Sequence, residues 1–346
     1  MEPIKLQPFF APRIWGGRAL ETRFRKELPP GNIGESWEIS THPDGPSRVA
    51  SGTLAGLTLD EAIARWGAEQ VLGVPAADFP LLIKLLDARD VLSVQVHPDD
   101  AYALRTEGEL GKTEAWVILA AQPGASIVYG VVPGASPETF RAALARGELA
   151  GQLRSVPVHP GEVFNIPAGM VHALGRGILV YEVQQNSNAV YRVYDWDRLE
   201  NGKPRQLHLD KALDVIAWDN CGMDAGAEGL SLSTRGGTAR LMVVNRYFTL
   251  RQLDVAGEMP LEPGRFHAIT VAQGSGAIAW AGGTLPLAGG ESVLVPAALS
   301  GVSLTGEFRA LDAGATDRGL LNTWVGGQQA SWSAVPGLQQ YIKEEA

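Results

Sequence analysis

The sequence has 346 residues, 45% of them hydrophobic, and is long enough for two or three domains with sizeable cores. Its 29 basic and 38 acidic residues give a formal charge of −9, which argues against general binding of nucleic acid or anionic membranes. A locally basic pocket for a small anionic molecule is compatible with this charge.

Glycine (41 residues) and proline (22 residues) are frequent, and many turns at this density favour an all-β architecture. The single cysteine, Cys221, cannot form an intrachain disulfide, which fits a reducing compartment. The N-terminus lacks the apolar core of a signal peptide, and no segment approaches the roughly 18 apolar residues of a membrane span. We therefore expect a cytoplasmic protein.

The predicted elements are strands and turns over 1–57, a helix over 59–72, two strands within 80–97, helices over 100–108 and 137–153, and strands again over 155–197. Thr58 and Glu61 form a capping-box pattern at the start of the first helix. Pro137 stands at the first position of the third helix, where its missing N–H has no cost.

Four side chains in strands and turns are expected to bind a metal. The segment VLSVQVHPDD alternates, so Gln95 and His97 project from one strand face while valines pack behind them. The run KTEAW places Lys112 and Glu114 together in the same way, and His172 follows a proline–glycine turn. Two imidazoles, one carboxylate and one carboxamide oxygen suit Zn²⁺ or another divalent first-row ion. The expected ligands of this catalytic metal are Gln95, His97, Glu114 and His172.

A weak internal repeat relates two segments of the chain. Residues 161–172 have the form G-x5-P-x-G-x2-H, and residues 290–301 keep its Gly, Glu, Val and Pro in register. In the second copy Ala298 replaces the glycine and Gly301 replaces His172. Both copies are typical of the strand–turn–strand of a small barrel, so the second barrel is expected to keep the frame without the metal.

The expected organisation is a catalytic domain over 1–220, a Gly- and Ser-rich linker over 220–238, a degenerate C-terminal domain over 236–318, and a tail over 319–346. The tail contains Trp324, Trp332 and Tyr341 between polar stretches. Aromatic docking and disorder are both compatible with that pattern.

Six segments together resemble the type I mannose-6-phosphate isomerases (phosphomannose isomerases), in particular their short bacterial form. They are APRIWGG, GESWEIS, PLLIKLLDARDVLSVQVHPDD, GKTEAW, PAGMVHAL and YEVQQNSNAVYRVYDWDR. The motifs QVHP, KxE and E-x4-S-x4-R are specific when they occur in this order and spacing. The resemblance implies a mainly β fold of two cupin-type β-barrels (jelly rolls), with a small helical insertion in the first, metal-bearing half.

By this resemblance the four expected ligands hold one Zn²⁺ per chain, and Lys112 and Arg192 lie in the substrate pocket. Glu182 matches a carboxylate proposed as the family's base, and Arg192 matches its active-site arginine. Ser93 and Ser36 are expected to line the pocket. The implied activity is the interconversion of mannose 6-phosphate and fructose 6-phosphate through an enediol.

An aldose–ketose isomerisation moves a proton between C1 and C2 and places negative charge on oxygen, so it needs a base near the carbons and positive charge near the oxygens. Strand alternation puts Glu182 on the face of Val180 and Gln184, where burial would raise its proton affinity. Arg192 does not readily lose its proton and is assigned to phosphate or enediolate. The base is open between Glu182, a metal-bound water and a histidine.

Two other functions compete with this one. A cupin oxygenase is the first, because two histidines and a carboxylate can also hold Fe(II). A non-catalytic cupin that binds a sugar phosphate is the second. Gln95, together with Lys112, Glu182 and Arg192, favours the isomerase. The expected partner is a small-molecule sugar phosphate, without nucleic acid or a membrane, and the expected assembly is a monomer or homodimer.

Overall fold

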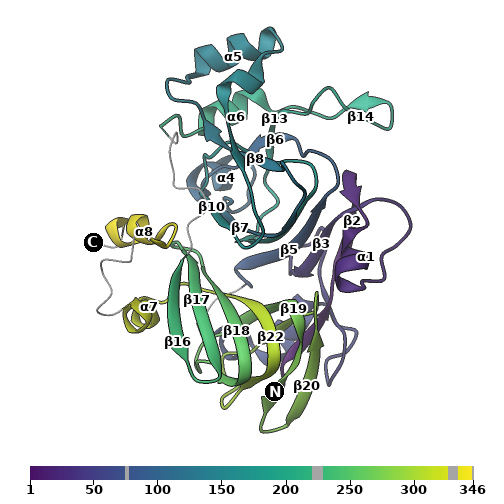
Figure 1. Ribbon diagram of the computed structural model, residues 1–346, viewed down its shortest axis with the longest axis vertical. Helices are drawn as coiled ribbons and strands as arrows, with labels where there is room; N and C mark the ends of the chain where they lie inside the picture. The colour runs from purple at the N-terminus through teal and green to yellow at the C-terminus, as the bar shows by residue number, and fades with distance from the viewer. Residues whose placement is uncertain (75–77, 220–228, 326–333, 345–346) are drawn as a thin grey trace.

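The structure, a computed structural model, describes residues 1–346 except 75–77, 220–228, 326–333 and 345–346. Strands in three large sheets make up most of it, and the helices lie at their periphery (Figure 1). The sheets are jelly-roll-like and open rather than closed barrels, and this arrangement confirms the predicted mainly β fold. Cys221 and Trp332 lie outside the described residues.

The first jelly roll consists of two sheets that pack against each other. The six-stranded sheet has the order β10 (Val163–Ile166), β7 (Glu114–Ala121), β12 (Ile178–Gln185), β5 (Leu81–Ala88), β2 (Phe9–Gly17), β3 (Ile33–Ile39). The five-stranded sheet has the order β13 (Tyr191–Tyr194), β6 (Val94–Val96), β11 (His172–Leu174), β8 (Ser126–Val131), β9 (Leu153–Pro157). Trp116 and Phe164 of the larger sheet share a buried cluster with Ile127 and Leu174 of the smaller one. A separate hairpin pairs β14 (Leu199–Glu200) with β15 (Lys203–Pro204).

The second jelly roll is built from one nine-stranded sheet. Its order is β16 (Leu230–Thr234), β17 (Gly237–Val244), β18 (Thr249–Pro260), β22 (Ser303–Gly314), β19 (His267–Trp280), β21 (Ser292–Val295), β1 (Ile4–Gln7), β4 (Arg48–Val49), with β20 (Gly283–Ala288) paired to β19. Alternating apolar positions fill its interior, for example Leu253, Ile269 and Leu304.

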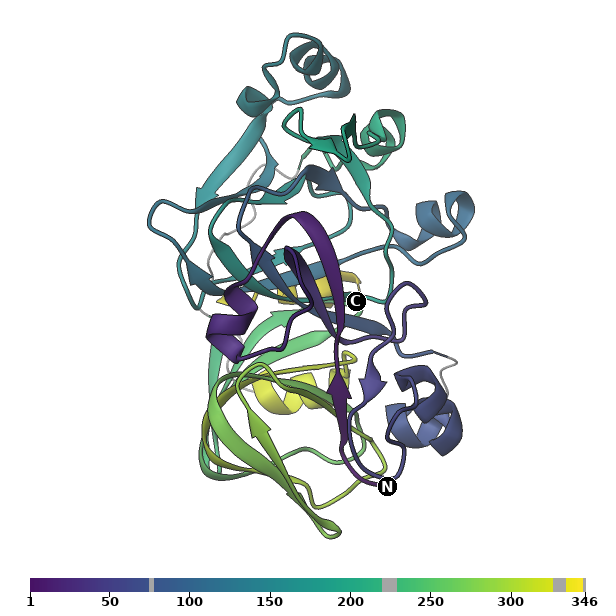
Figure 2. The same ribbon diagram turned by 90° about the vertical axis from the view of Figure 1, so that its right-hand side faces the viewer.

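The N-terminal segment joins the two halves. Strand β1 pairs with β21 of the second jelly roll, whereas β2, which follows at once, belongs to the first. Figure 2 shows this segment, in purple, extending from the lower half into the upper one. A buried cluster also spans the two halves, with Leu85 and Tyr181 on one side and Leu250 and Leu311 on the other. The division into domains over 1–220 and 236–318 stays a prediction, and the pairing of β1 with β21 crosses it.

The predicted helix over 59–72 is two helices, α2 (Leu59–Trp66) and α3 (Ala68–Leu72). Its start is as expected, because the Thr58 amide donates to Glu61 Oε2 at 2.8 Å. Gly67 has φ of 89°, outside helical backbone space, and this interrupts the helix.

The other two predicted helices are shorter than expected. The helix expected over 100–108 is α4 (Asp100–Thr106), and Asp99 caps it by accepting from the Tyr102 amide at 2.8 Å. The helix expected over 137–153 is α5 (Pro137–Ala145), and a 3₁₀ turn η1 (Leu149–Gln152) follows before β9. Two helices complete the first half, α1 (Ala19–Phe24) and α6 (Leu209–Val215).

The internal repeat appears as one hydrogen-bond pattern formed twice. Gly161 and Gly290 both have positive φ and donate their amides to Ile118 and Val271 respectively. The carboxylate that follows each glycine caps a backbone amide three residues earlier, so Glu162 accepts from His159 and Glu291 accepts from Ala288. Strands β10 and β21 then begin two residues after each glycine. The two segments therefore have the same local structure.

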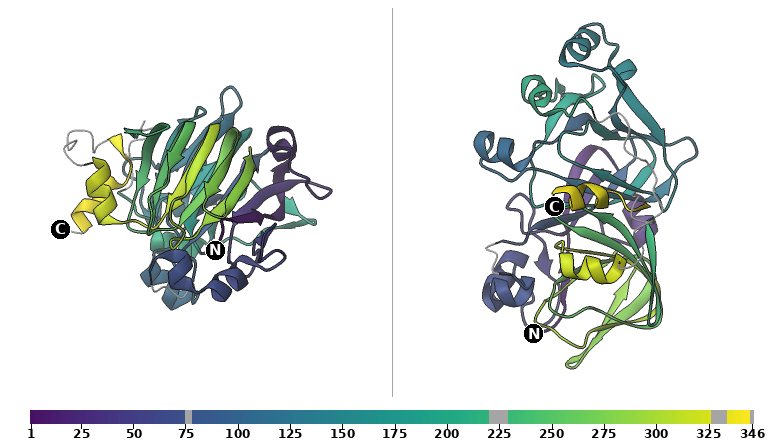
Figure 3. Two further views of the ribbon diagram at one scale, coloured as in Figure 1. Left: turned by 90° about the horizontal axis from the view of Figure 1, so that it is seen from below. Right: turned by 90° about the vertical axis from the view of Figure 1, so that its left-hand side faces the viewer.

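The described part of the tail is helical and docked, which agrees with the aromatic-docking alternative. It forms α7 (Arg318–Val325) and α8 (Leu338–Glu344) against β16 and β17 (Figure 3). Leu338 is 1% exposed and Tyr341 is 8% exposed. The Trp324 ring lies over the Arg251 guanidinium at 4.3 Å.

Candidate active site

Strand pairing brings two of the predicted ligands together. Gln95 on β6 lies directly opposite His172 on β11 in an antiparallel pair, so their side chains project from the same face. His97 follows β6 immediately and is 1% exposed. Glu114 opens β7 in the other sheet and points between the two sheets, fully buried. His97, Glu114 and His172 thus meet although they are distant in sequence, and Gln95 lies opposite His172.

His97, Glu114 and His172 form a buried group with metal-binding geometry, since one ligand atom from each lies within 4.8 Å of the others. The His97 Nε2 atom is 3.4 Å from Glu114 Oε2, and the His172 Nε2 atom is 3.3 Å from Glu114 Oε1. All four of these atoms are buried and have no hydrogen-bond partner among the described residues. Orphaned buried polar atoms are costly, and a cation at their centre would satisfy all of them.

Backbone carbonyls orient both imidazoles. His97 Nδ1 lies 2.9 Å from the Ala189 carbonyl, and His172 Nδ1 lies 2.9 Å from the Met170 carbonyl. A carbonyl can only accept, so each Nδ1 carries the proton and each Nε2 presents a lone pair toward Glu114. This is the tautomer that a metal-binding histidine requires.

The ionisation states of the three residues also suit a cation. Burial, with the positive charge of Lys112, lowers the pKa of His97 to about 3, and burial lowers the pKa of His172. Burial alone would raise the pKa of Glu114, but Lys112 and the two imidazoles hold it well below its usual range. Two neutral imidazoles and a carboxylate are the forms that coordinate a metal.

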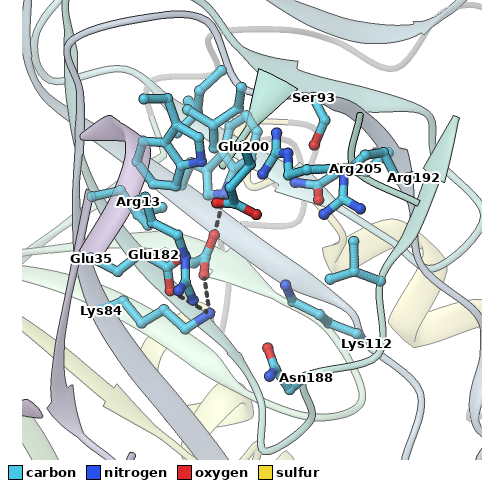
Figure 4. A pocket seen from close by; sticks show the side chains of 17 residues that line it. Arg13, Glu35, Lys84, Ser93, Lys112, Glu182, Asn188, Arg192, Glu200 and Arg205 are labelled. Atoms are coloured by element: carbon cyan, nitrogen blue, oxygen red, sulfur yellow. Dashed lines mark hydrogen bonds and ion pairs between the residues drawn. The ribbon is translucent and has the colours of Figure 1, made fainter. Parts of the chain in front are cut away.

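A cavity of about 350 Å³ lies beside this group and is lined by charged side chains from both sheets (Figure 4). Five residues predicted for the site line it, namely Ser93, Gln95, Lys112, Glu182 and Arg192. The Lys112 ammonium is 3.0 Å from Glu114 Oε2, as an ion pair without hydrogen-bond alignment. The pKa of Lys112 is raised because Glu114 and Glu182 outweigh its burial, so it stays protonated.

Glu182 faces into the cavity from β12. The Trp116 indole N–H donates to Glu182 Oε2 at 2.9 Å, and the Lys84 ammonium lies 3.2 Å from Oε1. Burial and the charge of Glu114 raise the pKa of Glu182 despite Lys84 and Lys112. A carboxylate with raised proton affinity suits a general base.

Arg192 lies on β13, on the opposite side of the cavity. Its Nη1 donates to the Gln206 carbonyl at 2.7 Å, and its Nε is buried with no hydrogen-bond partner in the part of the chain that the structure describes. The amide of Arg192 donates to His208 Nδ1 at 3.2 Å, which ties β13 to the start of α6. Burial and the charge of Arg205 lower the pKa of Arg192, so a bound anion would be favoured there.

The expectation that Ser36 lines the pocket is wrong. Ser36 is fully buried on β3, and its hydroxyl donates to Glu38 Oε1 at 2.5 Å. Glu38 in turn accepts from Ser292 of the second jelly roll. Neighbours along a strand face opposite ways, so Glu35 lines the cavity while Ser36 points to the interface between the two halves.

Several residues of the cavity were not anticipated. Arg13, Glu35 and Lys84 continue the charged network from Glu182, with Arg13 Nε 2.6 Å from Glu35 Oε1 and Lys84 Nζ 3.9 Å from Glu35 Oε2. Arg205 follows the β14–β15 hairpin and contacts Asp195. Lys84 had a visible signal, because it is the single charge inside the apolar run PLLIKLL of a buried strand.

Among the described residues, no helix is long and apolar enough to cross a membrane.

Two family models match the chain. Residues 4–113 match the catalytic domain of type I phosphomannose isomerase, and residues 238–312 match the cupin domain of mannose-6-phosphate isomerase. The chain is 37% identical over 313 residues to the mannose-6-phosphate isomerase of Streptococcus mutans, covering 90% of this chain and 97% of that protein. It is 38% identical to mannose-6-phosphate isomerase ManA of Bacillus subtilis, covering 88% and 96% respectively.

Solved structures agree with these sequence relatives. The crystal structure of the mannose 6-phosphate isomerase from Bacillus subtilis superposes with a TM-score of 0.85 at 39% identity, covering 90% of this chain and 99% of that one. A putative mannosephosphate isomerase from Archaeoglobus fulgidus gives a TM-score of 0.73 at 24% identity, covering 91% and 98%. At that lower identity the likeness concerns the fold alone.

Proposed function

Since this chain belongs to the type I phosphomannose isomerase family, its reaction is the interconversion of mannose 6-phosphate and fructose 6-phosphate, and we propose that the cavity beside Lys112, Glu182 and Arg192 carries it out. The observation that carries this assignment is the buried group of His97, Glu114 and His172, whose orphaned atoms converge beside that cavity. Family membership favours the isomerase over the oxygenase and the sugar-phosphate sensor that the sequence left open.

The donor set fits a divalent metal, and we assign its ligands as Gln95, His97, Glu114 and His172. One ligand atom from each of His97, Glu114 and His172 lies within 4.8 Å of the other two, and Gln95 shares the strand face of His172. An ion held there would supply Lewis acidity to the sugar oxygens at C1 and C2. Two imidazoles with oxygen donors suit Zn²⁺ or another divalent first-row ion, and we propose zinc.

Glu182 is assigned as the base that moves the proton between C1 and C2. Its carboxylate faces the cavity, is held by Trp116 and Lys84, and has a raised pKa, all of which support this role. In the forward direction it accepts the proton from C2 of the aldose while O1 gains a proton, and it then returns its proton to C1 of the enediol while the O2 hydroxyl loses one. Trp116 and Lys84 hold the two carboxylate oxygens of Glu182 in one orientation.

Lys112 and Arg192 are assigned to the negative charge of the substrate and the enediolate. Lys112 stays protonated and can donate to a sugar oxygen from beside Glu114. Arg192 presents an unpartnered Nε from the other side of the cavity. The predicted cytoplasmic location fits a sugar-phosphate substrate and stays a prediction.

The test is a coupled assay for fructose 6-phosphate formed from mannose 6-phosphate. A chelator should abolish turnover, added Zn²⁺ should restore it, and the rate should be the same without oxygen. His97→Ala should lose metal and activity together, whereas Arg192→Ala should keep metal and lose turnover. An Arg192→Ala enzyme with full activity would remove this residue from the site.

A further inference from the structure

Another cavity lies at the junction of the two halves and shares no lining residue with the active-site cavity. Its volume is about 660 Å³, against about 350 Å³ for the active-site cavity. One wall is the C-terminal end of α1, and the other is formed by β19 and by the turn between β20 and β21 (Figure 1). Small-molecule sites usually have volumes of roughly 300 to 1,000 Å³, so this junction groove is large enough for a metabolite. Its polar side chains are those of Arg23, Arg25, Gln273, Ser275 and Glu291.

Phe24 fixes the end of α1 against the second jelly roll. It is the last residue of α1, is 8% exposed, and belongs to the buried cluster that spans the two halves. A Cβ atom added at Gly290 would lie 2.4 Å from the Phe24 Cβ atom, so only glycine leaves room for this contact. The equivalent Gly161 of the first jelly roll has open space at that position. The residues on either side of Phe24 are therefore held at the groove.

The backbone at Arg25 brings two arginines to the same groove. Positions i and i+2 of a helix do not face each other, so a continued helix would point Arg23 and Arg25 in different directions. Arg25 instead has φ of 55°, in the left-handed region, and its amide closes the helix by donating to the Glu21 carbonyl at 2.8 Å. Glycine is the usual residue at such a helix end because it adopts positive φ without strain. An arginine in this conformation costs stability, and its side chain lines the groove, which points to a role in binding.

The groove has an excess of positive charge. The side chains of Arg23 and Arg25 make no hydrogen bond and no ion pair with the described residues. The carboxylate of Glu291 is already occupied, with Oε1 2.7 Å from the Lys5 ammonium and Oε2 accepting from the Ala288 amide at 2.8 Å. Counting Lys5 with the two arginines, three cations face one carboxylate, a formal balance of +2 on a chain of net charge −9. Two guanidiniums whose donors are free attract a dianion and can bind its oxygens in pairs.

We propose that the junction groove binds a small dianion, either a phosphomonoester or a dicarboxylate, between the Arg23 and Arg25 guanidiniums. Gln273 and Ser275, which are exposed on β19, donate to its remaining oxygens. The bound molecule bridges α1 of the first half and β19 of the second. It therefore stabilises the folded chain, because it binds a surface that exists only when both halves are folded. The site lies outside the active-site cavity and takes no part in the isomerisation.

The test is equilibrium dialysis of the holoenzyme against labelled inorganic phosphate and against labelled succinate, at a chloride concentration that screens weak surface binding. Arg23→Gln removes one guanidinium. Arg25→Gly removes the other and introduces the residue that adopts the left-handed conformation without strain. Arg65→Gln is the matched control, because Arg65 is exposed on α2 and lies outside the groove. Melting temperature with and without each anion, and KM for mannose 6-phosphate, are measured for every variant.

The wild type and Arg65→Gln should bind one equivalent of dianion that Arg23→Gln and Arg25→Gly bind about 10- to 100-fold more weakly, the loss expected for a charge-assisted hydrogen bond. A saturating anion should raise the melting temperature of the wild type more than that of Arg25→Gly. Without the anion, Arg25→Gly should melt at or above the wild-type temperature, because glycine relieves the strain. A stable fold with weakened binding distinguishes a ligand-binding role of Arg25 from a structural one. KM should stay within twofold of the wild type in all three variants.

Equal binding in the wild type, Arg23→Gln and Arg25→Gly would overturn the proposal. A loss of the same size in Arg65→Gln would also overturn it, because it would indicate only a general effect of charge. A rise of KM in parallel with the weakened binding would place the dianion in the active-site cavity and would contradict a separate site. The preference between phosphate and succinate identifies which dianion the groove takes. Dialysis does not depend on isomerase activity, so failure of this site and failure of the proposed function are distinguishable.

Discussion

Glu182 and Asp312 occupy equivalent positions in the two jelly rolls. Glu182 on β12 lies opposite Trp116 and Lys84, and Asp312 on β22 lies opposite Ile269 and Arg251. Trp116 is two residues beyond Glu114, and Ile269 is two residues beyond His267, so the frames coincide. The register also shifts at the same point in both strand pairs. In β12–β7 the shift lies between Leu179 and Val180, and in β19–β22 it lies between Val271 and Gln273.

The second jelly roll therefore has an ion pair at the position where the first has Glu182, the residue that we propose as the base. Arg251 and Asp312 are 2.7 Å apart, as counterparts of Lys84 and Glu182. His267, at the position of Glu114, binds Asp312 through Nδ1 at 3.0 Å. Trp324 of the tail covers Arg251. The same strand positions thus hold a buried ion pair in both halves, and only in the first half does that pair line the cavity.

We expect Asp312→Asn to lower the free energy of unfolding by about 3 kcal/mol, because it leaves Arg251 and His267 buried with a weaker partner. Asp254→Asn on β18 breaks the exposed pair with Arg309 and should cost less than about 1 kcal/mol. Chemical denaturation followed by tryptophan fluorescence measures both. Turnover per folded molecule should be unchanged in Asp312→Asn, and a loss no larger than that of the control would refute this role.

Gln95→Ala should weaken metal binding about tenfold or more without abolishing it, because three ligands remain. Titration against a competing chromophoric chelator gives the affinity. Asn186→Ala is the matched control, since its carboxamide donates to Thr41 away from the cavity. Unchanged affinity in Gln95→Ala would leave a three-residue site of His97, Glu114 and His172.

The local parts of the site could be predicted from the sequence because strand alternation is a short-range property. It put Gln95 beside His97, and Lys112 beside Glu114, before any tertiary contact was known. The repeat likewise predicted a second jelly roll, because its turn depends on residues close in sequence. Ser36 was expected in the pocket from the family resemblance alone. Alternation puts Glu35 and Ser36 on opposite faces of β3, and only the structure shows that the face of Glu35 lines the cavity.

The remaining features depend on contacts between distant segments. Lys84 is visible as a lone charge in an apolar strand, but its partners follow from the pairing of β5 with both β12 and β3, which local patterns do not encode. The pairing of β1 with β21 joins residues almost 300 positions apart, for example Ile4 with Leu294. Arg205 enters the cavity because a hairpin returns there, and its contact with Asp195 has no sequence signature.

The free energy of unfolding should fall in acid because Glu35 becomes protonated. Burial would raise its pKa, but Lys84 and Arg13 hold it at about 2, below the value near 4.3 of an unfolded chain. A carboxyl group whose pKa is lower in the folded than in the unfolded chain stabilises the folded state above its unfolded pKa. This contribution is lost as the pH falls from about 4 to about 2. The contribution is at most roughly 3 kcal/mol for a shift of this size.

Denaturation of wild type and Glu35→Gln across this pH range measures the effect. The wild type should be more stable at pH 6, and the two curves should converge as the pH approaches 2. Glu69→Gln, an exposed position on α3, should follow the wild type throughout. Parallel curves for wild type and Glu35→Gln would show that Glu35 is not the responsible group.

Trp116→Phe should move the acid limb of the activity profile to higher pH. The indole N–H donates to Glu182 and lowers its pKa, against the larger effect of burial, which raises it. Removing the donor raises the pKa of Glu182 further, so a higher pH is needed to deprotonate the base. The pH dependence of kcat/KM measures this shift, and metal content must be checked because Trp116 also packs edge-on against His172 at 5.4 Å. If the limb stays in place while activity falls, another group is the base and Glu182 serves to hold Lys84.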